Sequence, residues 1–207
     1  MLQEREESTK SLIIDVAEEL FGRQGIAGTS LRHILRESGQ KNMSAITYHF
    51  GTKDDLVRSI IFDRWQAVDE LVGRDLGLAS GNPESVPFEQ LVRIAVRPGF
   101  DLKNANGGRS YCLFVSALLS DADYKKYWFD LNTLGPNMKA VSKLMRQALG
   151  LSNRKFIFRT GILMHCFYSA ASEHDMLKAR KLNIFSDEEF FDEITSMLAS
   201  AWAAADI

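Results

Sequence analysis

Apolar residues recur at helical spacing along most of this chain of 207 residues, and no segment carries a compelling strand pattern. The N-terminal run, residues 10–24, places Ile13, Ala17 and Phe21 on one face, and Gly25 is suited to end it. Similar periodicity predicts later helices over residues 52–72, 88–96, 109–119, 136–149 and 153–180, and from Ser186 onward. The expected fold is all-α.

The stretch from Thr29 to Leu56 predicts two short helices joined by a tight turn and followed at once by a third. Thr29 is the expected N-cap of the first and Gly39 its terminator. The second helix is expected over residues 43–50, and Thr52 with Asp55 forms a capping-box-like start for the third. A short helix anchored by one apolar edge suits insertion into a DNA major groove, so this stretch is a helix-turn-helix candidate.

The overall net charge of −2 gives no support for binding nucleic acid, but its distribution does. Residues 1–28 carry three basic and six acidic groups, whereas residues 29–53 carry four basic groups and one acidic group. The sign of the charge therefore changes where the helix-turn-helix candidate begins.

Cysteine usage and hydropathy point to a cytoplasmic protein. Cys112 and Cys166 form neither a disulfide framework nor a metal-ligand pattern, so two buried thiols are expected, with no metal and no cofactor. The acidic N-terminus lacks the apolar core of a signal peptide, and the chain contains no run of about 18 apolar residues that could span a membrane.

Residues 10–62 resemble the N-terminal module of the tetracycline-repressor (TetR) family of bacterial transcription regulators. The resemblance depends on Leu20-Phe21, Gly25, Thr29, Ile34 and Gly39, and above all on the run from Tyr48 to Lys53 with Asp55-Leu56. Compared with the family, the turn near Gln40-Lys41 is one residue longer, and Thr47 stands where many members have Tyr. The resemblance implies a DNA-binding domain over residues 1–55 and a helical effector-binding and dimerisation domain over residues 56–207.

The candidate DNA contacts divide into two groups. Met43, Ser44 and Thr47 are candidates for base edges, because hydroxyl groups donate or accept hydrogen bonds and methyl groups can touch the thymine methyl. An ordinary solvated helix face is the alternative for these three. The phosphate candidates, of which Tyr48 and His49 rest on the resemblance, are Thr29, Arg32, Lys41, Tyr48, His49 and Lys53.

The last two helices are expected to pair the chain with a second copy. Residues 153–180 are apolar on more than one face, and the final helix presents Phe190, Ile194 and Leu198. The alternative is a long central helix in the core of a monomer. A homodimer also suits a small reading helix, because two copies related by a two-fold axis read a palindromic operator in double-stranded DNA.

The middle of the chain is expected to hold a small-molecule effector, weakly indicated to be apolar or aromatic. The candidate lining residues are Phe100, Phe114, Leu118, Trp128, Met145, Met164, His165 and Tyr168. For each of them, plain core packing is the alternative, and His165 is more typical of a satisfied core histidine.

The favoured function is a ligand-responsive, homodimeric repressor that an effector releases from its operator. An enzyme is disfavoured, because the sequence has no dinucleotide fingerprint, P-loop, HExxH or GxSxG motif. The second alternative is a helical small-molecule-binding or interaction protein without DNA-binding activity.

Overall fold

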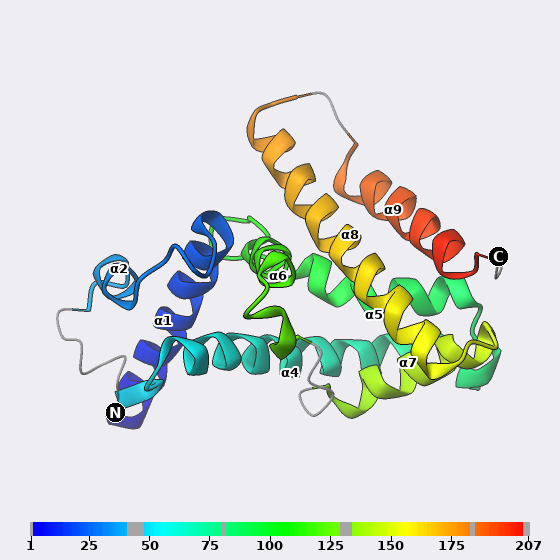
Figure 1. The fold of residues 1–207 in the computed structure, drawn as a ribbon, viewed down its shortest axis with the longest axis horizontal. Coiled ribbons are helices and arrows are strands. Elements are labelled where there is room, and N and C mark those ends of the chain that lie inside the picture. Colours follow the sequence, from blue (N-terminus) through cyan, green and yellow to red (C-terminus); the bar gives the residue numbers. More distant parts are fainter. Residues whose placement is uncertain (1, 41–47, 80–81, 129–133, 183–184, 205–207) are drawn as a thin grey trace.

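The computed structural model describes residues 2–40, 48–79, 82–128, 134–182 and 185–204, and this part of the chain is helical without a strand, so the all-α prediction is confirmed (Figure 1). None of the described helices has both the length and the apolar character needed to cross a membrane. The elements in chain order are α1 (Leu2–Gln24), α2 (Leu31–Glu37), α4 (Lys53–Ala79), the 3-10 turn η1 (Pro83–Ser85), α5 (Phe88–Asp101), α6 (Ser110–Ser120), the 3-10 turn η2 (Lys125–Tyr127), α7 (Pro136–Ala148), α8 (Asn153–Ala179) and α9 (Asp187–Trp202).

The ends of α2 show why this short helix stops and starts where it does. Its N-cap is Ser30, whose hydroxyl accepts a hydrogen bond from the backbone N–H of His33, so the prediction that Thr29 is the cap was wrong by one residue. Its C-terminal end follows the prediction: Gly39 has a φ of 68° and donates its N–H to the carbonyl of Arg36. That left-handed turn favours glycine, which has no Cβ to clash.

α4 is the long connection between the N-terminal helices and the rest of the molecule (Figure 1). Its start was predicted correctly, because Asp55 donates its N–H to the Thr52 hydroxyl and its carboxylate accepts the N–H of Thr52. The helix continues to Ala79, past the predicted end at Val72. With 27 residues and a rise of about 1.5 Å per residue, it is about 40 Å long.

α5 corrects a second prediction, because it does not end before Pro98 but runs through that proline to Asp101. A proline inside a helix removes one hydrogen bond and costs about 3 kcal/mol. Here Pro98, Gly99 and Phe100 are all buried, and this burial offsets the cost. A Cβ at Gly99 would lie 2.9 Å from the hydroxyl oxygen of Tyr168, so a larger residue there would have to displace that buried side chain.

The core is largely aromatic and joins helices that are distant in the sequence. Phe21 of α1 meets Phe114 of α6 with ring centroids 6.3 Å apart. Phe100 of α5 lies 6.3 Å from Phe167 of α8 and 5.1 Å from Phe191 of α9, again between ring centroids. The predicted starts of α8 and α9 are confirmed, and Ser186 forms the expected capping box with Glu189.

The close contact of α1 with α6 yields a stability prediction at Gly22. A Cβ at this position would lie 2.8 Å from Cγ of Leu113 and 3.0 Å from the backbone nitrogen of Phe114. Gly22→Ala should therefore lower the free energy of unfolding by about 1–3 kcal/mol, as overpacking does, measured by urea denaturation.

Gly77→Ala is the matched control. Gly77 is also helical, and a Cβ there would meet no atom within 4 Å. This substitution should stabilise the protein by about 0.5–1 kcal/mol. Equal effects of the two substitutions would contradict the close approach of α1 to α6.

Candidate DNA interface and effector cavity

The N-terminal end of the molecule presents several of the candidate DNA-binding side chains on its surface. The side chain of Tyr48 is 73% exposed and contacts His49 edge-on, with ring centroids 5.1 Å apart. Arg32, the second residue of α2, is exposed as well and forms no ion pair with any described residue. Beneath them, the buried side chains of Ile34 and Phe50 hold this surface on the core. Arg32 and Tyr48 are therefore free to contact a ligand.

Thr29 does not belong to this surface. It is only 1% exposed, and its hydroxyl donates to the carbonyls of Gly25, at 2.9 Å, and Leu20, at 3.3 Å. The prediction that its side chain contacts a phosphate is therefore wrong. The hydroxyl instead ties the start of α2 to the end of α1.

Lys53 is half-buried at the start of α4, and its ammonium group already has a partner. Its Nζ donates to the carbonyl of Ala27 at 3.3 Å and lies 5.8 Å from the ring centroid of Phe21. Burial lowers the pKa of Lys53, while Asp121 and Asp54 act in the opposite direction. The lysine thus links α4 to the segment before α2. The remaining predicted contacts, Lys41, Met43, Ser44 and Thr47, lie outside the described residues.

A buried charge network fixes α1 to α4 and α6. Glu18 of α1 is 2% exposed, accepts a hydrogen bond from Arg64 Nε of α4 at 2.6 Å and another from the Ser110 hydroxyl at 2.5 Å. Arg64 also pairs with Asp15. Burial raises the pKa of Glu18, and the Arg64 guanidinium acts against that shift. A buried carboxylate that lost one of these partners would be strongly destabilising, so the three helices are held together.

A second contact fixes α4 to α7. Asp69 of α4 accepts hydrogen bonds from the backbone N–H of Met138 at 2.8 Å and from the side-chain amide of Asn137 at 3.0 Å. The Asp69 carboxylate therefore caps the N-terminus of α7 from a neighbouring helix. The fit requires Gly135, where a Cβ would lie 2.1 Å from the carboxyl carbon of Asp69.

A cavity of about 300 Å³ lies between α4, α7 and α8, with further walls from α5, the end of η2 and the end of α9. Its interior is aromatic and sulfur-rich, and Trp65 and Trp128 pack there with ring centroids 5.1 Å apart. The lining residues are Trp65, Val68, Ala95, Trp128, Leu134, Met138, Lys139, Ser142, Lys143, Met145, Arg146, Asn153, Phe156, Ile157, Thr160, Met164, Tyr168 and Trp202.

Half of the predicted effector-binding residues line this cavity: Trp128, Met145, Met164 and Tyr168. Phe100, Phe114 and Leu118 do not line the cavity. All three are fully buried in the core between helices. His165 also lies outside the lining, and its Nε2 is 3.1 Å from the Ser120 hydroxyl. The structure does not bring these four residues to this cavity, and the three apolar ones pack in the core.

Sequence reasoning missed the walls contributed by α4 and α9, chiefly Trp65 and Trp202. It also missed the basic residues of α7. Lys139, Lys143 and Arg146 follow one another at intervals of four and three positions, which places them on one helical face. That spacing was readable in the sequence, whereas the meeting of α4 and α9 at one cavity depends on the tertiary fold.

Comparison with known proteins shows what the N-terminal part of this chain is similar to. Residues 13–60, from α1 into the first turns of α4, match the sequence profile of the bacterial regulatory proteins of the TetR family. A stretch of 97 residues is 36% identical to the HTH-type transcriptional regulator AcrR of Shigella flexneri. This stretch is 44% of the chain and 42% of that relative, so less than half of the relative's length is matched.

Residues 13–60 are thus similar to the TetR family of bacterial regulatory proteins. The fold of the chain agrees over nearly its whole length with solved structures that are described as TetR-family regulators. One from Shewanella sp. PV-4 covers 93% of the chain and 97% of its own length, with a TM-score of 0.63 at 14% identity. Another from Mesorhizobium loti covers 96% and 97%, with a TM-score of 0.57 at 16% identity.

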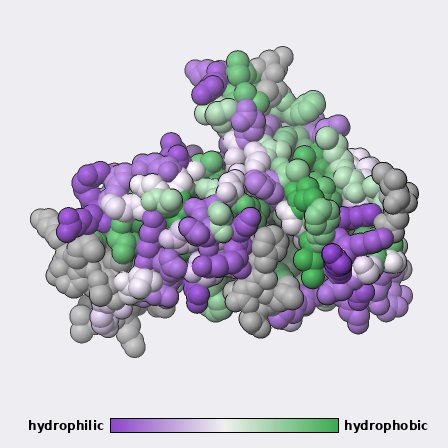
Figure 2. All heavy atoms as spheres, in the orientation of Figure 1, coloured by the Kyte–Doolittle hydropathy of each residue, from purple (hydrophilic) through white to green (hydrophobic). Residues whose placement is uncertain are grey.

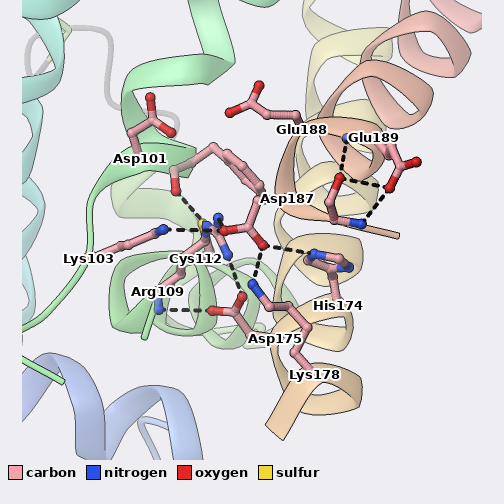
Figure 3. A network of polar contacts seen from close by, with 12 residues as sticks. Asp101, Lys103, Arg109, Cys112, His174, Asp175, Lys178, Asp187, Glu188 and Glu189 are labelled. Carbon is pink, nitrogen blue, oxygen red and sulfur yellow. Dashed lines mark hydrogen bonds and ion pairs between the residues drawn. The ribbon is translucent and has the colours of Figure 1, made fainter. Parts of the chain in front are cut away.

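An ion-pair cluster around Arg109 joins α6, α8 and α9 (Figure 3). Arg109 is 4% exposed, donates from Nε to the carbonyl of Phe100 at 2.7 Å, and pairs with Asp175 and Asp187. Lys178 and His174 reach Asp187 from α8. Burial would raise the pKa of Asp187, but the hydrogen bonds from Lys178 and Arg109 hold that pKa well below its ordinary value.

The lowered pKa of Asp187 predicts a pH-dependent contribution to stability. Because the folded-state pKa lies below the unfolded one, the contribution is fully present above about pH 4 and is lost as the pH falls further. Asp187→Asn should lower the free energy of unfolding by about 1–3 kcal/mol at pH 7, since Arg109 and Lys178 lose a charged partner. The difference from wild type should shrink below pH 4, measured by urea denaturation across pH.

Glu193→Gln is the control for this prediction, because Glu193 is an exposed residue of the same helix. Its effect should stay within about 0.5 kcal/mol at every pH. A loss at Asp187→Asn that did not change with pH would show that the carboxylate charge is not what joins these helices.

Proposed function

We propose that this protein is a homodimeric, ligand-responsive transcriptional repressor that binds a palindromic operator and releases it when a small molecule fills the cavity between α4, α7 and α8. The single observation that carries the proposal is that α4 belongs to both parts of the molecule. It begins at Lys53, inside the region that matches the family profile, and it contributes Trp65 and Val68 to the cavity wall.

In this proposal, residues 1–55 form the DNA-binding domain and residues 56–207 the effector-binding and dimerisation domain. Met43, Ser44 and Thr47 read base edges, while Arg32, Lys41, Tyr48, His49 and Lys53 contact the DNA backbone. The exposure of Arg32 and Tyr48 supports the proposal that these two side chains contact the DNA backbone. Lys53 would have to exchange its bond to the Ala27 carbonyl for a phosphate, and its place at the start of a helix favours an anion.

The proposed transmission follows the fixed contacts of α4. Trp65 lies twelve residues, or about 18 Å along the helix, from Lys53. A ligand that displaces the cavity wall at Trp65 shifts α4, and the Arg64–Glu18 pair passes that shift to α1. Release requires only that the ligand bind more tightly to a conformation whose two reading heads no longer match the operator spacing.

A second copy of the chain is the proposed partner of α8 and α9. Figure 2 shows apolar residues gathered over α8, whereas the end with α1 and α2 is mostly hydrophilic. Exposed apolar residues of these two helices include Ile157, Phe158 and Ile162 on α8 and Met197 on α9, and Phe158 is 68% exposed. Large exposed side chains of this kind, gathered on two adjacent helices, are typical of a subunit interface.

Arg32→Ala tests the DNA contact. Loss of one phosphate contact should weaken binding to every duplex by a similar factor and should reduce the slope of log affinity against log salt by about 1. Fluorescence anisotropy with a labelled duplex, repeated across salt concentrations, measures both quantities. Arg180→Ala, an exposed residue at the end of α8, is the control and should bind like wild type. An unchanged slope for Arg32→Ala would remove Arg32 from the interface.

Ile162→Glu tests the dimer. Ile162 is 50% exposed in the isolated chain, and a carboxylate buried there against a second copy would be unpaired. The variant should sediment as a monomer at concentrations where the wild type sediments as a dimer. Phe62→Glu is the control, because Phe62 is similarly exposed, at 55%, but lies on α4. If Ile162→Glu and wild type had the same mass in solution, the proposed interface would be wrong.

A further inference from the structure

The cavity between α4, α7 and α8 offers hydrogen-bond donors and positive charge, but among the described residues no acidic side chain lines it. Its inner wall is apolar, with aromatic rings from Trp65, Trp128, Phe156 and Trp202 and thioethers from three methionines. A volume of about 300 Å³ lies at the lower end of the range for small-molecule sites, roughly 300–1,000 Å³. The apolar body of a bound molecule is therefore small.

Two buried donors in this lining have no acceptor. The indole N–H groups of Trp65 and Trp202 make no hydrogen bond to the described part of the protein, although the two residues are 7% and 1% exposed. A buried N–H without a partner costs about 1–3 kcal/mol. Because both residues line the cavity, a ligand that carries acceptor oxygens there could remove this cost.

The rim of the cavity on α7 is basic. Lys139, Lys143 and Arg146 all contribute to the lining and form no ion pair with any described residue. Lys139 and Lys143 are exposed and Arg146 is half-buried, so their apolar stems can cover a ligand while their charged ends stay hydrated. Among the described lining residues, a cationic ligand would meet only like charge, whereas an anion would meet three cations that form no ion pair with a described residue.

We infer that the effector is a small amphipathic organic anion, whose compact aromatic body packs among the tryptophans and whose carboxylate lies toward Lys143 and Arg146. This inference rests on the proposed function, because it assigns the chemical class of the effector for the same cavity. It replaces the broader expectation of an apolar or aromatic ligand by one with a stated charge.

The test compares three probes of nearly equal shape: para-tert-butylbenzoate, the corresponding neutral benzamide and the corresponding benzylammonium. Titration calorimetry with the full chain should show the benzoate binding at least about tenfold more tightly than the benzamide, and the benzylammonium most weakly. All three tryptophans of the chain line the cavity, so tryptophan fluorescence reports whether the benzoate enters it.

Two pairs of variants assign the preference to named groups. The double substitution Lys143→Gln with Arg146→Gln should bring the affinity for the benzoate to within about threefold of the affinity for the benzamide. Arg180→Gln should leave the ratio of the two affinities unchanged. Trp65→Phe should weaken benzoate binding several-fold, because it removes one unpartnered donor. Trp128→Phe removes a similar ring area from the cavity wall but no unpartnered donor, so it should weaken benzoate binding less than Trp65→Phe does.

Equal affinities for benzoate and benzamide, tightest binding of the benzylammonium, or no binding of any probe would each overturn the inference. None of these titrations contains DNA, so its failure can be separated from failure of the proposed function. If a duplex is bound but the anion is not preferred, the inference alone fails. If the benzoate is preferred but no duplex is bound, the cavity keeps its assigned ligand class and the regulatory role fails.

Discussion

The attachment of α4 at two points, to α1 through Arg64–Glu18 and to α7 through Asp69, is the constraint on which the rest of this structure depends. Both contacts involve buried carboxylates whose partners come from other helices, so neither can be stretched without leaving a charge poorly paired. In the proposed mechanism, this helix of about 40 Å carries a change at the cavity wall to Lys53, its first residue.

The two proposed activities, effector binding and DNA binding, make different chemical demands, and the candidate residues for them lie in separate parts of the chain. DNA binding needs exposed cationic and hydrogen-bonding groups, and Arg32 and Tyr48 are exposed candidates. The cavity needs apolar volume with a few polar groups, and it has aromatic walls, two unpartnered indole donors and a basic rim. The Arg109 cluster binds α6 to α8 and α9, and so gives the cavity and the apolar face of α8 a common scaffold.

Local chemistry made much of this fold predictable from sequence. The caps at Thr52 and Ser186 and the turn at Gly39 each depend on residues within a few positions of one another, and all three were predicted correctly. Pro98 led to a wrong prediction for the end of α5. The free-energy cost of a proline inside a helix is local, whereas the burial that offsets this cost comes from other helices. For the same reason, only four of the eight residues predicted to bind the effector line the cavity. Aromatic and methionine residues mark apolar faces, but only packing decides that Trp128 lines a space and Phe114 fills one.

Selection of bound duplexes from a random pool by the full-length protein, followed by anisotropy titration of the enriched sequence, tests the central claim most directly. An effector-responsive DNA-binding regulator should enrich a palindrome, bind it with an affinity that falls steeply with salt, and release it in the presence of some small-molecule extracts. Failure to enrich any sequence at low ionic strength, with and without those extracts, would contradict the claim.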